Sequence, residues 1–291
     1  MSPNDTNLSE TDIRSPGSRT WCVRAATDDP RPWLVGAPVC PELQAHRIAH
    51  LGVAKMRAPF EIVRTKLGGT YFLSCRSGAG RVFVDGRWKT CEAGQAFLLS
   101  PGTLHAFHAT EGAPWEFSWI RYAEGTGRNP IAGANSPVLA EMDPAPLQHA
   151  VFGLFHSTLK PSMPAATVAW IEMIQRYVEH FAGPATLDPR LARVWDKVAK
   201  DLARPWTSGE LATTAHLSEK QFERLCRREL GRTPRQHLIW LRIREAARRL
   251  TSGSETIETI AAAVGYANPF TFSTTFRRFT GWSPSRYPGR R

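Results

Sequence analysis

The segment SEKQFERLCRRELGRTP, residues 218–234, recurs fifty residues later as NPFTFSTTFRRFTGWSP, residues 268–284. The matched pairs are Phe222/Phe272, Arg227/Arg277, Arg228/Arg278, Gly231/Gly281, Thr233/Ser283, Pro234/Pro284 and His237/Tyr287. Upstream of them, Leu211-Ala212 corresponds to Ile260-Ala261 at an offset of 49. A repeat of this length predicts one supersecondary unit that is used twice.

The first copy has the pattern of two helices joined by a tight turn. Ser208 suits the N-cap of a short helix, and His216-Leu217 suits the turn that follows it. Ser218 then suits the cap of a helix that runs to Leu230, with Gln221 placed as in a capping box. A short helix, a tight turn and a second helix with a polar outer face are the parts of a helix-turn-helix.

The second copy repeats this pattern with different polar residues. A helix over residues 255–264 is followed by a turn at Gly265 and by a second helix from Pro269 to Thr280, with Asn268 as its cap. Between the copies, residues 234–250 read as one helix that would hold the two units in a fixed relation.

The positive charge of the chain lies in the segment that carries the repeat. Residues 190–291 hold 20 Lys and Arg against 9 Asp and Glu, which gives the whole net charge of +11. Residues 1–189 hold 17 of each kind and are neutral. A basic domain beside a neutral one favours a polyanionic partner, most often nucleic acid, over a basic surface that only aids solubility.

The neutral part begins with short apolar or alternating segments that predict strands. Their spacing of about ten residues, with Gly and Pro between them, is typical of a sandwich or a barrel. The clearest segments are residues 70–75, 80–84, 95–99 and 115–120, with turns such as Asp85-Gly86 and Pro101-Gly102. Residues 125–145 read as a connection. From residue 146 the apolar period becomes three to four, which predicts helices that pack on the barrel or pair with a second subunit.

The remaining features of the sequence indicate in which compartment of the cell the protein is expected. Residues 1–20 are polar and resemble neither a signal peptide nor a membrane anchor, so we expect a flexible arm there. The five cysteines are odd in number and form no Cys-x-x-Cys pair, which argues against disulfides and zinc and for a cytoplasmic protein. No apolar run approaches the roughly 18 residues of a membrane span, and no membrane partner is expected.

The basic segment resembles the DNA-binding domain of the AraC/XylS family of bacterial transcription regulators over about residues 195–288. The residues that carry the resemblance are Leu211-Ala212, Ser218, Phe222, Arg224, Gly231-x-Thr-Pro234, Arg242-Ile243 with Ala246, Ile260-Ala261, Gly265-Tyr266, Phe272, Phe276-Arg277 and Gly281-x-Ser-Pro284. The resemblance implies two recognition helices that enter adjacent major grooves on one face of double-stranded DNA.

Residues 94–105 and 114–121 resemble the cupin-like ligand-binding domain of the same family, over about residues 45–125. The implied fold class is α+β with two domains: a cupin-like β-barrel or jelly roll with bridging helices, and an all-α domain with two helix-turn-helix units. We place the arm at 1–20, the sensing domain at 21–145, linking or dimerisation helices at 146–189 and the DNA-binding domain at 190–291. We also expect a homodimer, with RNA polymerase as a candidate further partner.

Base-reading residues are expected in the first turns of each recognition helix. In the first copy the family motif favours Lys220, Glu223 and Arg224. Arg224 suits guanine, Glu223 suits cytosine and Gln221 suits adenine. A solvated face is the alternative for Lys220 and Glu223. The second-copy candidates are Asn268, Phe270, Thr271 and Thr274. Their methyl and ring groups suit thymine methyls, unless this unit clamps the backbone and Phe270 packs on its own domain.

Arginines further along both helices are expected at phosphates. These are Arg227, Arg228, Arg277 and Arg278. We expect the first copy to supply most of the hydrogen-bonded base reading, because its outward positions carry charged side chains and those of the second copy do not.

The barrel is expected to hold a small-molecule effector. Candidates for the lining are Trp33, Arg57, Arg64, Tyr71, His105, Trp115, Trp119 and Arg121. Aromatic faces stack on sugar rings, and Arg or His bonds hydroxyls or carboxylates. A sugar or related metabolite is therefore the effector expected by analogy with the family.

Metal chemistry is not expected in the barrel. A metal cupin needs a His-x-His pair and a Glu on one strand, but residues 67–84 contain neither residue type, which leaves His105 and the nearby His108. Three or four ligands are normally needed for a stable site. We therefore expect no metal, cofactor or catalytic residue. The alternatives are a cupin-type metalloenzyme and a ligand-independent architectural DNA-binding protein.

Overall fold

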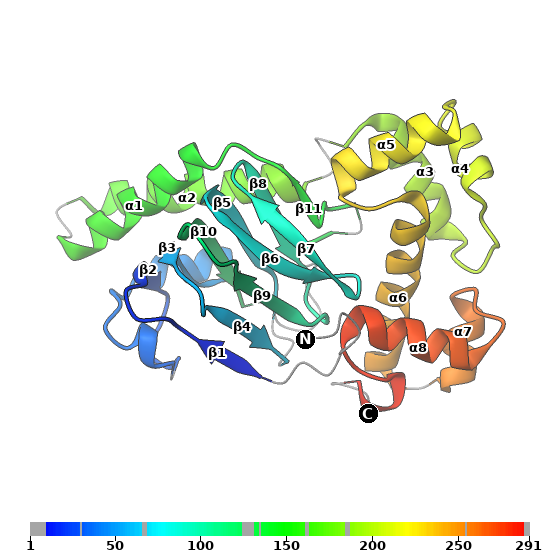
Figure 1. Cartoon of the computed structure of the whole chain (residues 1–291), viewed down its shortest axis with the longest axis horizontal. Coiled ribbons are helices and arrows are strands. Elements are labelled where there is room, and N and C mark those ends of the chain that lie inside the picture. The colour runs from blue at the N-terminus through cyan, green and yellow to red at the C-terminus, as the bar shows by residue number, and fades with distance from the viewer. Residues whose placement is uncertain are drawn as a thin grey trace.

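The computed structural model describes residues 10–29, 31–65, 69–123, 131–133, 135–160, 163–183, 187–253 and 255–287. Its N-terminal part consists of antiparallel sheets with two helices beside them, and its C-terminal part is helical (Figure 1). The α+β fold with two domains is thus confirmed.

The strands form two sheets that face each other. Sheet A has the order β1-β4-β9-β6-β7 and sheet B the order β11-β8-β5-β10-β3-β2, with antiparallel pairing between neighbours. The strands are β1 Thr11–Ile13, β2 Arg19–Arg24, β3 Ile48–Met56, β4 Glu61–Arg64, β5 Tyr71–Ser77, β6 Ala79–Val84, β7 Arg87–Glu92, β8 Gln95–Leu99, β9 His105–Ala109, β10 Trp115–Tyr122 and β11 Leu139–Glu141. The 3-10 helices η1 Pro32–Leu34 and η2 Pro41–His46 precede β3.

Sheet B is apolar on both faces, because successive side chains of a strand point in opposite directions. Leu73 of β5 and Trp119 of β10 face sheet A and belong to the core between the sheets. Phe72 and Ile120, their chain neighbours, belong to a second core on the outer face. Burial on both faces explains the apolar runs that predicted these strands.

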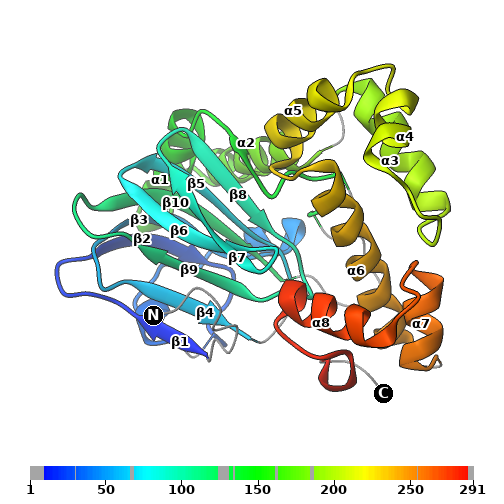
Figure 2. The same ribbon diagram turned by 45° about the vertical axis from the view of Figure 1, so that its right-hand side comes forward.

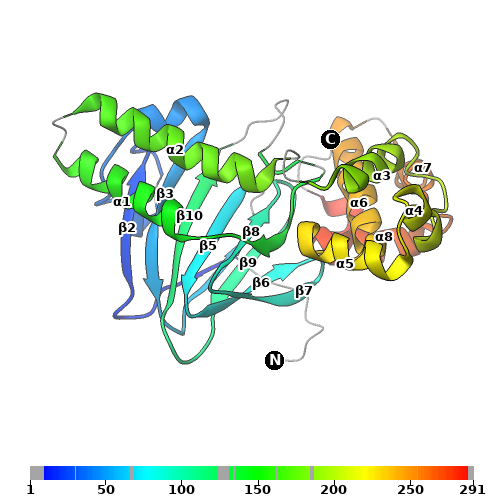
Figure 3. The same ribbon diagram turned by 90° about the horizontal axis from the view of Figure 1, so that it is seen from above.

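Two helices cover the outer face of sheet B (Figure 3). They are α1, Ala145–Leu159, and α2, Pro164–Ala182. Their buried stripes pack on the sheet, and Tyr122 Oη donates to Gln175 Oε1 at 2.9 Å across this boundary. Of the two alternatives for the buried stripes, packing on the barrel is therefore the one observed.

The helical domain contains the two repeated units. Its helices are α3 Pro189–Lys200, α4 Ser208–Thr214, α5 Glu219–Leu230, α6 Pro234–Ser252, α7 Ile257–Ala263 and α8 Pro269–Thr280, followed by the 3-10 helix η4 Pro284–Arg286. Ser218 and Gln221 form the expected capping box of α5, and Asn268 caps α8. The cap of α4 is Thr207 with Glu210, and not Ser208, because the box needs a glutamate three residues after the cap.

The flexible arm expected at residues 1–20 differs from the structure over the residues that are described. Thr11–Ile13 form β1, an edge strand that pairs antiparallel with β4, and Arg19 begins β2. Residues 1–9 lie outside the described part of the chain. An edge strand needs only backbone partners on one side, which a polar segment supplies as well as an apolar one.

Candidate functional site

A cavity of about 510 Å³ lies in the N-terminal domain, between residues of both sheets. That volume is within the range of small-molecule sites in proteins. One part of its wall is aromatic, from Phe60, Phe107, Phe117 and Trp119. Another part is polar and carries four arginines, two histidines and three carboxylates, and Ala54, Met56 and Ile62 add aliphatic surface.

Most of the residues predicted to line a pocket lie in this cavity. They are Trp33, Arg64, Tyr71, His105, Trp119 and Arg121. Trp115 does not line it. Its side chain is fully buried, and its indole N–H donates to Cys75 Sγ at 3.2 Å. Arg57 is exposed beyond the end of β3 and does not reach the cavity, so both of these expectations were wrong.

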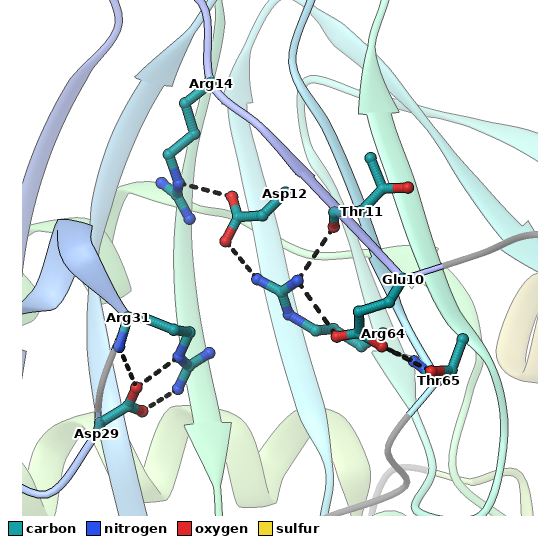
Figure 4. Close-up of polar contacts among 8 residues, drawn as sticks. All are labelled: Glu10, Thr11, Asp12, Arg14, Asp29, Arg31, Arg64 and Thr65. Carbon is teal, nitrogen blue, oxygen red and sulfur yellow. Dashed lines mark hydrogen bonds and ion pairs between the residues drawn. The ribbon is translucent and has the colours of Figure 1, made fainter.

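The sequence reasoning missed the contribution of β1. Glu10, Asp12 and Arg14 alternate along the chain and all reach the cavity, as side chains on one face of a strand do. Arg64 of β4 lies between them: its guanidinium contacts Asp12 at 2.5 Å and Glu10 at 3.5 Å (Figure 4). Arg14 Nε donates to the other oxygen of Asp12 at 2.9 Å.

Three further polar lining residues were missed, Asp29, Arg31 and His50, and they lie beside Trp33. Arg31 forms an ion pair with Asp29 just before η1, with its Nε at 2.7 Å from Asp29 Oδ1 (Figure 4). His50 of β3 faces the same region. For the lining residues of β1, the alternation of Glu10, Asp12 and Arg14 was the signal in the sequence that could have revealed them. The local pattern does not say which sheet edge such a segment joins.

His50 is held as a neutral ring in one tautomer. Trp119 Nε1 donates to His50 Nδ1 at 3.0 Å, so the ring proton is placed on Nε2. Burial, followed by the charges of Arg31 and Arg121, lowers the pKa of His50 well below its usual value. Its Nε2 is buried and has no hydrogen-bond partner among the described residues.

His105 faces the cavity from β9. Burial and then the charge of Arg121 lower the pKa of His105 to about 4, although its bond to Ser100 raises it. His105 Nε2 lies 2.9 Å from Ser100 O, and the neutral ring donates there. Arg121 donates to the carbonyls of Thr70 and Tyr122.

The predicted DNA-contacting residues are all exposed. On α5, Lys220 and Arg224 form no hydrogen bond or ion pair that is seen within the described chain. Glu223 is instead bonded to Arg227 one turn on, at 2.9 Å. Gln221 Oε1 accepts from Ser218 in the capping box. That oxygen is therefore already used, which leaves Gln221 unsuited to bidentate pairing with adenine unless the cap opens.

The second recognition helix presents a different surface. Asn268 Oδ1 accepts from the N–H groups of Phe270 and Thr271, so the cap occupies it. Phe270 is 84% exposed and does not pack on its own domain. Thr271, Thr274 and the predicted phosphate contacts Arg228 and Arg277 are exposed too. Arg278 is exposed overall, but its aliphatic chain lies against Gly86 of the barrel.

Both recognition helices end against the sensing domain. Gly231 and Gly281, fifty residues apart, adopt left-handed conformations with φ of 68° and 92° and end α5 and α8. A Cβ at Gly231 would lie 2.2 Å from Leu139 O of β11, and one at Gly281 would lie 3.2 Å from Leu104 Cβ. Figure 2 shows these helix ends beside the sheets. Each copy of the repeat therefore also provides a docking point, by which we mean a contact between the end of its recognition helix and the sensing domain. The first docking point is at Gly231 and the second is at Gly281.

A buried ion pair fixes the first docking point. Asp85, in the turn between β6 and β7, accepts from Arg232 Nε at 2.7 Å and from Arg232 Nη2 at 2.9 Å. The exposed fractions of the two side chains are 6% and 4%. Lys89 of β7 donates to Gly231 O at 2.7 Å, which gives the end of α5 a further partner.

The second docking point joins α8 to the loop between β8 and β9. Leu104 N donates to Thr280 O at 3.2 Å, and Tyr287 Oη donates to Gly102 O at 2.9 Å. Trp282 packs on the helical core and also on a cluster of Val63, Phe83, Leu104 and Ala106. These contacts tie the end of the second helix-turn-helix to sheet A.

The residues described above contain no group of three or more His, Cys, Asp or Glu side chains arranged to hold a metal ion. His108 contacts the Trp88 ring instead. Among the helices described, none is long and apolar enough to cross a membrane.

Two protein families match successive parts of the chain. Residues 64–158 match the AraC-like ligand binding domain, and residues 211–290 match a helix-turn-helix domain. Together with the fold, they define a DNA-binding regulator with a ligand-binding domain.

Several proteins are similar to this chain over most of its length. An AraC-like transcription regulator of Streptomyces antibioticus is 33% identical over 229 residues, which are 72% of this chain and 70% of that protein. The MmsAB operon regulatory protein of Pseudomonas aeruginosa is 28% identical over 73% of each chain. Fatty-acid-bound ToxT of Vibrio cholerae is 16% identical over 81% of this chain and 93% of its own, with a TM-score of 0.39. The chain belongs to the AraC family of transcription regulators and is not an enzyme.

Proposed function

We propose that the protein binds specific operator sequences through α5 and α8, and that a small molecule in the barrel cavity controls this binding. The observation that carries the proposal is the position of the cavity. Sheet A separates the cavity from the end of α8. A molecule in the cavity therefore contacts one face of these strands, and the DNA-binding domain contacts the other face.

Alternation along β9 and β4 supports this control. His105 and Phe107 line the cavity, while Leu104 and Ala106 lie in the cluster that packs on Trp282. On β4, Arg64 lines the cavity and Val63 belongs to the cluster. A packed wall of this kind transmits small displacements because protein interiors have few voids to absorb them. An effector that moves His105 would displace the Leu104 contact with Gly281.

For DNA recognition we propose a division between the two units. Lys220 and Arg224 extend from the first turns of α5 without partners in the described chain, which suits contact with base edges. On α8, Phe270, Thr271 and Thr274 offer apolar contacts for thymine methyls. Arg227, Arg228, Arg277 and Arg278 are proposed to contact phosphates, with Glu223 positioning Arg227.

The assembly is proposed to be a homodimer in the cytoplasm. Apolar side chains remain exposed along α1 and α2 and between them, at Leu159, Met163, Val168 and Met173. Such a patch is suited to pairing with a second copy of the chain. RNA polymerase is proposed as a partner of the DNA-bound dimer. A sugar or related metabolite is the effector that the family analogy favours.

One experiment tests the control step on the full chain. An operator is first isolated by capture of genomic fragments and located by footprinting. Compounds that raise the Tm of the protein are then added to operator titrations. We expect a stabilising compound to change the operator Kd at least fivefold, within the range of typical coupling free energies. A compound that binds without changing the Kd would contradict control, and the absence of a specific footprint would contradict operator recognition.

A further inference from the structure

The turn of each helix-turn-helix contains one residue with a left-handed backbone, at equivalent positions of the repeat. In the first unit it is His216, with φ of 54°, and in the second it is Gly265, with φ of 82°, 49 residues further on. Histidine is one of the few residue types besides glycine that tolerate this conformation. The first unit therefore shows that the turn itself does not require glycine, so the glycine of the second unit has another cause.

That cause is the close approach of the first unit to the second. A Cβ at Gly265 would lie 2.8 Å from Ala203 O and 2.7 Å from Arg242 Nη2, and real Cβ atoms do not come this close to other atoms. Ala203 belongs to the segment between α3 and α4, which leads into the first helix-turn-helix. His216 is exposed and has room for its side chain. The turn of the second unit is thus packed on the backbone of the first.

Arg242 of α6 lies at the point where the two units meet. Its guanidinium donates to three backbone carbonyls, from Nε to Leu202 O at 2.9 Å, from Nη2 to Arg204 O at 2.8 Å and from Nη1 to Gly265 O at 3.4 Å. The first two carbonyls belong to the segment that leads into the first unit, and the third belongs to the turn of the second. A planar guanidinium holds several acceptors in a fixed geometry. One side chain therefore links both units, which α6 also connects along its length (Figure 1).

Each end of this link continues toward a recognition helix. In the first unit, Arg204 Nη2 donates to Glu210 Oε1 of α4 at 2.8 Å, and α4 precedes α5. In the second unit, the Tyr266 ring contacts Phe272 of α8 edge to face, with centroids 5.5 Å apart. The guanidinium carbon of Arg242 lies 5.9 Å from the centre of the Tyr266 ring. A displacement at Arg242 would therefore shift α8 relative to α5.

We propose that Arg242 and Gly265 set the spacing between the two base sequences that one chain reads. The link fixes the distance and the angle between α5 and α8. One extra base pair moves the second sequence by about 3.4 Å along B-DNA and turns it by about 35° around the axis. Linked helices cannot follow this displacement without losing contacts at Arg242 or at the DNA. The proposal rests on the proposed recognition of operators by α5 and α8, and it adds the residues that determine which operator spacing is accepted.

Operators with altered spacing test the link on the full chain. The operator found by footprinting supplies the starting sequence. The changes in base preference of Arg224→Ala and Phe270→Ala locate the base pairs near each recognition helix, and one base pair is inserted or deleted between them. We expect either alteration to weaken binding by the original chain roughly tenfold, as the loss of one matched base pair does. Equal affinity of the original chain for all three spacings would overturn the proposal.

Arg242→Gln should reduce this preference for the native spacing by about threefold or more, because α6 alone leaves the angle between the units less restricted. A merely structural role would weaken all three spacings by the same factor and leave the ratio of their Kd values unchanged. Arg242→Lys keeps the charge but not the planar fork, so it should give an intermediate ratio. Arg248→Gln is the matched control on α6, because this arginine pairs with Glu245 of its own helix and its side chain is 68% exposed. An unchanged ratio in Arg242→Gln would contradict the spacing role.

A second pair of variants tests the close approach and does not depend on the folding of Arg242→Gln. Gly265→Asn places a Cβ against Ala203 O, and asparagine tolerates the left-handed backbone, so the main effect is to push the two units apart. His216→Asn introduces the same residue at the equivalent turn, where the position is exposed. We expect the spacing ratio to change by about threefold or more in Gly265→Asn and to stay the same in His216→Asn. Equal ratios in these two variants would overturn the proposal.

The outcomes also distinguish this proposal from the proposed function. The absence of any specific footprint would contradict operator recognition, and the spacing role would fall with it. A specific footprint whose spacing ratio is the same in the original chain, in Arg242→Gln and in Gly265→Asn would leave operator recognition standing and would remove only the spacing role.

Discussion

Leu104 and His105 are consecutive residues that face opposite sides of sheet A. His105 lines the cavity, whereas Leu104 contacts Gly281 at the end of α8 and donates its backbone N–H to Thr280 O. Ser100 and Gly102 of the same loop bond His105 and Tyr287 respectively. The loop between β8 and β9 is thus held by the cavity on one side and by the second helix-turn-helix on the other.

Leu104→Ala should uncouple the two domains. It removes the side chain that packs on Gly281 and Trp282, and a Leu→Ala change at a buried position costs about 2–5 kcal/mol of unfolding free energy. We expect effector affinity to persist. The ratio of the operator Kd values measured with and without effector should fall toward one. Leu159→Ala, at a side chain that is 54% exposed on α1, is the control. Unchanged coupling in Leu104→Ala would show that the signal takes another route.

Asp85→Asn should destabilise the contact between α5 and the barrel. The change leaves the Arg232 side chain, at 4% exposure, buried without its charged partner, and breaking a buried ion pair in this way costs about 3–5 kcal/mol. Urea unfolding monitored by fluorescence gives the free energy. Arg248→Gln breaks the exposed Arg248–Glu245 pair and should change stability little. Equal effects of the two substitutions would argue against a stabilising role for the Asp85 pair.

The helical domain was predictable because its signals are local. Caps at Ser218 and Asn268, the apolar period and the left-handed glycines Gly231 and Gly281 all lie within one unit of the repeat. The repeat gave the start and the end of α5 and α8 correctly. It did not show that both glycines also contact the barrel, since that depends on residues about one hundred to two hundred positions away.

The cavity was only partly predictable because it is built from distant segments. The aromatic and basic candidates Tyr71, Trp119 and Arg121 line the cavity, but the sequence could not separate Trp115 from Trp119, which share a face of β10. Their places along β10 distinguish them: Trp115 begins the strand and packs against Cys75 and Phe117, whereas Trp119 lies four residues further along and reaches the cavity. The acidic and basic residues of β1 were missed because a polar edge strand lacks the apolar pattern that marks a strand.

Arg224→Ala and Arg277→Ala should affect DNA binding in different ways. If Arg224 reads a base, its loss costs about 1–3 kcal/mol of operator affinity and relaxes preference at one position. If Arg277 neutralises one phosphate, its loss weakens all DNA alike and reduces the salt slope by up to about 0.9. Titrations of single-base operator variants at several salt concentrations measure both effects. Unaltered base preference in Arg224→Ala would contradict direct readout.

Phe270→Ala should weaken operator binding and leave stability unchanged. The ring is 84% exposed, so its removal creates no cavity in the domain. We expect an unchanged Tm and a loss of preference for thymine at the position that the ring contacts. Met173→Ala on α2 is a matched control, because it also removes an exposed apolar side chain, at 44% exposure. An equal loss of affinity for every sequence would favour backbone clamping by the second unit.

Acidification should destabilise the sensing domain through its buried histidines. The pKa of His105 is lowered to about 4 by burial and by Arg121, whereas an unfolded histidine titrates near 6.5. Between these values the unfolded chain binds a proton that the folded ring does not. The free energy of unfolding therefore falls as the pH falls from about 6.5 to about 4, by up to roughly 3 kcal/mol for this one group. His50 acts in the same direction within the sensing domain, and His237 does so in α6 of the helical domain, since burial lowers the pKa of each. Urea unfolding across this range should show a shallower pH dependence for His105→Gln than for the original chain, with His149→Gln, at an exposed position of α1, measured beside it as a surface substitution of the same kind. The same slope in His105→Gln and in the original chain would mean that His105 does not stay neutral in the folded protein.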